Sequence, residues 1–78
     1  MFGRNKQTRQ EQVNEVADLY RAQNWGLDFY ESEQRILTTL RKSKTAAGEN
    51  TEHDDIAIEA LGIVISELKE KQQTFFRS

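Results

Sequence analysis

Residues 56–65 form the most apolar segment of the chain: nearly every position is apolar or small, and Glu59 carries the segment's only charge. If this segment is a helix, it is apolar around most of its circumference and must be covered on more than one side. The rest of the chain has few apolar residues with which to cover it. We therefore expect a small helical association module in which a partner completes the cover of the last helix.

The length and composition narrow the ways in which such a chain can be stabilised. Its 78 residues make one domain, and a chain this short buries only about 60% of its unfolded surface. There is no cysteine and a single histidine, so disulfides and cysteine-based zinc sites are excluded, and we expect no metal and no cofactor. Small domains without these supports commonly oligomerise, which favours a homodimer.

Start and stop signals predict an all-α fold, a small antiparallel helical bundle. Thr8 with Glu11, and Asp28 with Glu31, have the spacing of a capping box, in which each side chain bonds the other residue's backbone N–H. The predicted helices are residues 9–25, 29–46 and 52–74. Residues 1–7 are interpreted as a flexible N-terminal arm, and residues 8–78 as the single helical domain.

Glycines and polar residues mark the connections between these helices. Gly26 is expected to end the first helix in the left-handed conformation, and Gly48 to follow the second. Asn50 or Thr51 is the expected N-cap of the third helix, ahead of an acidic first turn.

The apolar pattern assigns a face to the second and third helices. In the second helix, Phe29, Ile36 and Leu40 share one face, with Tyr30 and Leu37 beside them. In the third, an a/d seam with alternating spacings of three and four residues predicts the centre of a dimer, and Gly62 would allow close approach of another helix. The predicted dimer or partner interface consists of Ile58, Leu61, Gly62, Ile65, Leu68 and Phe75.

The aromatic residues allow two interpretations. Trp25, Tyr30 and Phe76 are candidate anchors for a partner, because Trp and Tyr are enriched at interface hot spots. The alternative is internal packing, in which the rings around residues 20–30 and Phe75 form one cluster at the end of the third helix.

Basic residues offer a possible nucleic-acid interface in two clusters. Arg4, Lys6 and Arg9 could act as an arm, and a second patch at the end of the second helix consists of Arg41, Lys42 and Lys44. The pI of about 5.4 argues against this interpretation.

No catalytic constellation is recognisable. His53 lies in a charged first turn, and the paired carboxylates occupy helix starts and polar faces, where capping explains them. We therefore expect no enzymatic activity.

The function predicted from these features is a non-enzymatic adaptor or regulator that binds another macromolecule, with a protein as the favoured partner. The alternatives are a nucleic-acid-binding regulator and a helical inhibitor or immunity protein. The inhibitor would be a stable monomer with exposed Phe75 and Phe76. No apolar run reaches the roughly 18 residues of a membrane span, and the N-terminal region lacks the apolar core of a secretory signal. We expect a cytoplasmic protein that does not bind membranes.

Overall fold

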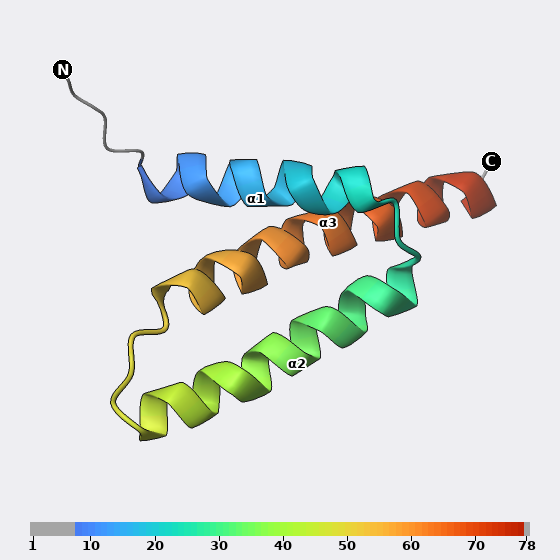
Figure 1. The fold of residues 1–78 in the computed structure, drawn as a ribbon. Helices are drawn as coiled ribbons and strands as arrows, with labels where there is room; N and C mark the ends of the chain where they lie inside the picture. Colours follow the sequence, from blue (N-terminus) through green and yellow to red (C-terminus); the bar gives the residue numbers. More distant parts are fainter. Residues whose placement is uncertain (1–7, 78) are drawn as a thin grey trace, which may run out of the picture.

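The computed structural model of the chain describes the backbone of residues 8–77 and the side chains of residues 8–72. Within this range there are three α-helices and no strand: α1 (Arg9–Gln23), α2 (Leu27–Ala46) and α3 (Glu52–Arg77) (Figure 1). The all-α fold and the three predicted helices are confirmed.

The helices form a thin layer with α3 in the middle. Figure 1 shows α1 along one side of α3 and α2 along the other, with α2 and α3 antiparallel. In the described part of the chain, α1 and α2 each pack on α3, whereas their backbones do not approach one another. The Cα atoms span 48 × 36 × 17 Å, so the bundle is flat.

The capping box predicted at the start of α1 is confirmed. The Thr8 hydroxyl oxygen accepts a hydrogen bond from the Glu11 backbone N–H at 3.1 Å, and the Thr8 N–H donates to Glu11 Oε1 at 2.8 Å. Two backbone donors that have no partner inside the helix are thereby satisfied.

The turn between α1 and α2 differs from the prediction at Asn24 and Gly26. Asn24, not Gly26, adopts the left-handed conformation, with φ 57°, which asparagine tolerates better than most residues. Gly26 is instead the extended N-cap of α2, so α2 begins at Leu27 and Asp28 lies inside its first turn. The capping box predicted for Asp28 and Glu31 is therefore wrong.

The connection between α2 and α3 follows the predicted signals. Gly48 takes a positive φ of 78°, and the Glu49 N–H donates to the Lys44 carbonyl oxygen at 2.8 Å. The Asn50 side chain accepts a hydrogen bond from the Glu52 N–H at 2.7 Å, which satisfies one donor at the start of α3.

The core lies where α3 is covered by both neighbours. It consists of Val13, Ala17, Tyr30, Ile56, Ala60, Leu61, Val64 and Ile65. The expectation that the rest of the chain has too few apolar residues to cover the apolar segment of α3 is wrong for the five residues of that segment that belong to this core. A central position between two helices allows α3 to bury two sides within one chain.

Candidate functional site

The apolar residues of α2 are divided between the core and the surface. Tyr30 is buried and Leu37 packs against the core. The face predicted from Phe29, Ile36 and Leu40 instead lies on the surface, where these side chains are 61%, 55% and 46% exposed. We call these three residues the α2 apolar row.

Contacts with α3 explain why this row is left outside. Tyr30 and Leu37 are seven residues apart and lie on the stripe of α2 that packs on α3. Between them, Gln34 Nε2 donates a hydrogen bond to the Ile58 carbonyl oxygen at 3.2 Å. The neighbouring stripe, which holds Phe29 and Ile36, cannot face α3 at the same time.

The N-terminal end of the α2 apolar row adjoins an aromatic cluster. Phe29 packs edge-on against Trp25, with ring centroids 5.0 Å apart, and Trp25 in turn contacts Tyr20 and Tyr30. The packing interpretation therefore describes Tyr30, which is buried, whereas Trp25 is half-buried beside the exposed Phe29. The side chains of Phe75 and Phe76 lie outside the described residues.

Two of the six residues of the predicted α3 interface are buried within one chain. Leu61 and Ile65 are 0% and 7% exposed, whereas Ile58, Gly62 and Leu68 are half-buried. A Cβ atom added to Gly62 would lie 3.5 Å from Gln34 Nε2, which is ordinary van der Waals contact. Self-association through α3 remains a prediction, but its two central side chains already belong to the core.

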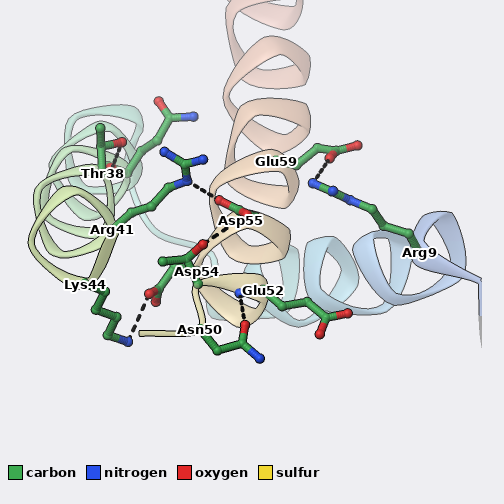
Figure 2. A network of polar contacts seen from close by, with 11 residues as sticks. Arg9, Thr38, Arg41, Lys44, Asn50, Glu52, Asp54, Asp55 and Glu59 are labelled. Atoms are coloured by element: carbon green, nitrogen blue, oxygen red, sulfur yellow. Dashed lines mark hydrogen bonds and ion pairs between the residues drawn. The ribbon is translucent and has the colours of Figure 1, made fainter. Parts of the chain in front are cut away.

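Three of the six predicted basic residues are engaged in ion pairs between helices (Figure 2). Arg9 Nη2 lies 2.8 Å from Glu59 Oε1, Arg41 pairs with Asp55, and Lys44 pairs with Asp54. Within the described residues, Lys42 is the member of the second basic patch for which no ion pair is found. Arg4 and Lys6 lie outside the described residues. A cation that is already paired with a carboxylate attracts the phosphates of a nucleic acid less strongly.

The third charged pair of this region fixes the end of α2 to the start of α3. The buried Asp54 carboxylate places Oδ2 2.9 Å from Lys44 Nζ (Figure 2). Its position in the first turn of α3 also suits a negative charge, because free backbone N–H groups gather there. This geometry gives Asp54 a structural role in joining two helices.

The hollow between α1 and α2 beside this network has no catalytic arrangement. Its lining includes Arg9, Thr38, Arg41 and Asp55, it is open to solvent, and its charges are paired. General acid–base chemistry needs a desolvated group with a shifted pKa. His53 is exposed, and no cluster of three metal-ligating side chains occurs in residues 8–72.

A further ion pair joins α1 to the middle of α3. Arg21 Nε lies 2.8 Å from Glu67 Oε1, and Arg21 Nη2 lies 2.7 Å from Glu67 Oε2. The hydrogen bonds from Arg21 lower the pKa of Glu67, and Glu67 raises that of Arg21. On α1, burial and, to a lesser extent, the charge of Glu33 raise the pKa of Tyr20.

Comparisons of the chain with known protein families, with curated proteins and with solved structures found no match. In the described region, no helix combines the length and the apolar character needed to cross a membrane. The residues themselves therefore carry the functional interpretation, and the most distinctive surface among them is the α2 apolar row.

Proposed function

We propose that this chain is a small non-enzymatic helical module that binds another polypeptide through the α2 apolar row. The observation that carries the proposal is the exposure of three large apolar side chains on one stripe of one helix. Single exposed apolar residues are common on protein surfaces, whereas here three lie along one stripe of one helix, with Ser32 and Glu33 on the turn between Phe29 and Ile36. Leu19 on α1, 64% exposed, is the contrasting single case.

The geometry suits recognition by a facing helix or an apolar groove. Phe29, Ile36 and Leu40 stand at positions i, i+7 and i+11, which are anchors along one helix face. Full burial of such a side chain contributes about 1.5–3 kcal/mol. Each is already partly covered, so the gain on binding falls below that range for each residue.

Burial of the centre of α3 supports a binding site on α2 rather than on α3. Using Leu61 and Ile65 for a partner would require opening the core, since both are buried against α1 and α2. The α2 apolar row can be covered with the fold intact. The absence of cysteine suits a reducing compartment, so we propose that the module acts in the cytoplasm.

A matched pair of variants tests the proposal. Leu40→Glu places a charge in the α2 apolar row, and Leu19→Glu makes the same change at an exposed leucine on α1. Tagged forms of both would be used to capture partners from cells, with quantitative mass spectrometry and circular dichroism as a check of folding. We expect a partner that is retained by Leu19→Glu and lost with Leu40→Glu. Equal capture by both folded variants would contradict the proposal.

A further inference from the structure

The charges of α2 are segregated along its length. The acidic residues Asp28, Glu31 and Glu33 lie in its first half, and the basic residues of the helix follow them: Arg35, Arg41, Lys42 and Lys44. Glu31 pairs with Lys69 of α3 at 3.4 Å, and Arg41 and Lys44 pair with Asp55 and Asp54. Among the described residues, the structure shows no ion pair for Asp28, Glu33, Arg35 or Lys42.

Three of these four residues line one flank of the α2 apolar row. Asp28, Arg35 and Lys42 recur at intervals of seven residues, so they share one side of the helix. Asp28 and Arg35 each stand one position before a member of the row, Phe29 and Ile36. A helix packed on the row would therefore meet negative charge at the start of α2 and positive charge at its end.

We propose that the occupant of the α2 apolar row is α2 of a second copy of this chain, running antiparallel about a two-fold axis near Gln34 and Arg35. The inference rests on the proposed function, because it assumes that the row is the binding face. In an antiparallel pair the same flank of each helix meets its copy. The acidic end of each helix then faces the basic end of the other.

One register satisfies both the apolar row and the charged flank. With the axis between residues 34 and 35, Phe29 lies opposite the partner's Leu40, and Asp28 lies close to the partner's Lys42. The two Ile36 side chains meet near the axis. In a parallel pair this flank would instead face the opposite flank of the partner helix, so the contact between Asp28 and the partner's Lys42 would be lost.

Arg35 is the exception to this complementarity, because it meets the partner's Arg35 close to the axis. This like-charge contact gives the inference a distinctive consequence. Removing the charge with Arg35→Gln should tighten the dimer, whereas most substitutions in an interface weaken it. With three large apolar side chains from each copy, the interface is small, and we expect dissociation on dilution.

Engineered cysteines test the direction of the helices, since the chain has no cysteine of its own. In the proposed register, Ser32 faces the partner's Thr39. The two Ser32 residues lie about 8 Å apart along the length of the helices, too far for a disulfide. A mixture of Ser32→Cys and Thr39→Cys should give the mixed disulfide under oxidation. Dominant Ser32→Cys homodisulfide would indicate a parallel pair and overturn the register.

Charge exchange tests the predicted contact at the ends of α2. Asp28→Lys should weaken the dimer about tenfold, because two attractive contacts become repulsive, and Lys42→Asp added to it should restore the affinity. Glu70→Lys, at an exposed site on α3, is the control for net charge and should leave the dissociation constant unchanged. Equal weakening of the dimer by Asp28→Lys and by the control Glu70→Lys would overturn the assignment of Asp28 and Lys42 as neighbours.

Sedimentation equilibrium of the purified chain separates failure of this inference from failure of the proposed function. A wild-type dimer that Leu40→Glu converts to a monomer, and that Leu19→Glu retains, supports the second copy as occupant. A chain that stays monomeric at high concentration overturns it. If that monomer still captures a foreign protein that Leu40→Glu loses, the row binds a different partner and the proposed function stands. If it captures none, both proposals fail.

Discussion

The hydroxyl group of Tyr30 donates a hydrogen bond to the backbone carbonyl oxygen of Tyr20 at 2.5 Å. The same hydroxyl accepts a hydrogen bond from the Trp25 backbone N–H at 3.1 Å. One buried side chain of α2 thus satisfies a carbonyl in the last turn of α1 and a donor in the turn that follows, groups that have no partner within a helix.

Replacing this hydroxyl should destabilise the fold. Tyr30→Phe keeps the ring but leaves part-buried backbone groups without a partner, which costs about 1–3 kcal/mol. Urea unfolding followed by circular dichroism measures the change. Tyr20→Phe is the matched control, because it removes a phenol and leaves the Tyr20 carbonyl in place. A loss no greater than in that control would show that the two hydrogen bonds contribute little.

Gly62→Ala should stabilise the chain. Gly62 lies inside α3, where glycine costs roughly 0.5–1 kcal/mol relative to alanine, and the added methyl group would meet Gln34 at an ordinary contact distance. We expect a higher urea midpoint with an unchanged oligomeric state. A decrease in stability or in self-association would instead indicate that a second helix approaches α3 at this glycine.

The Arg21–Glu67 pair should make stability depend on pH in the acidic range. The pKa of Glu67 is lower in the folded state, so its contribution is present above the unfolded pKa of about 4.3 and is lost as pH falls through the folded value. Both side chains are close to half-exposed, which limits the effect to less than about 1 kcal/mol. Urea unfolding of the wild type and of Glu67→Gln at several pH values measures the difference in their free energies of unfolding. This difference should shrink as the pH falls from 5 to 3. A constant difference would contradict the assignment.

Binding to nucleic acid should be weak and nearly independent of sequence. Arg9, Arg41 and Lys44 form ion pairs within the chain, so Lys42 is the one described member of the two basic clusters without an ion pair, and we expect few counterions to be released from phosphates. Fluorescence anisotropy with a random DNA duplex at low salt, repeated at increasing salt, measures the number released. A steep salt dependence that Arg41→Gln and Lys42→Gln reduce would support the alternative function.

Local signals in the sequence predicted most of the fold. The bond between Thr8 and Glu11 needs only three residues of helix, so its spacing was sufficient, and the end of the helical pattern placed Gly48 just after the second helix. The choice between Asn24 and Gly26 for the left-handed position was not decided locally. Both residues tolerate that conformation, and the hydrogen bonds of Tyr30 with Tyr20 and Trp25 add a tertiary constraint on the turn.

The candidate site was harder to predict because it depends on tertiary contacts. Two adjacent stripes of α2, one with Tyr30 and Leu37 and one with Phe29 and Ile36, satisfy helical periodicity equally well. Packing on α3 selected the first and left the second at the surface. Likewise, the pairing of Arg41 with Asp55 joins residues of different helices, and spacing along one helix does not predict such a contact.

The flat arrangement has a consequence for how the protein is made. The backbones of α1 and α2 both approach α3 and not one another, and the contact of Tyr30 with Tyr20 joins them beside their shared turn. Most of the cover of each helix is therefore missing while the ribosome is still translating the third helix. We expect the nascent chain to remain largely unstructured until α3 emerges, and then to fold in one cooperative step.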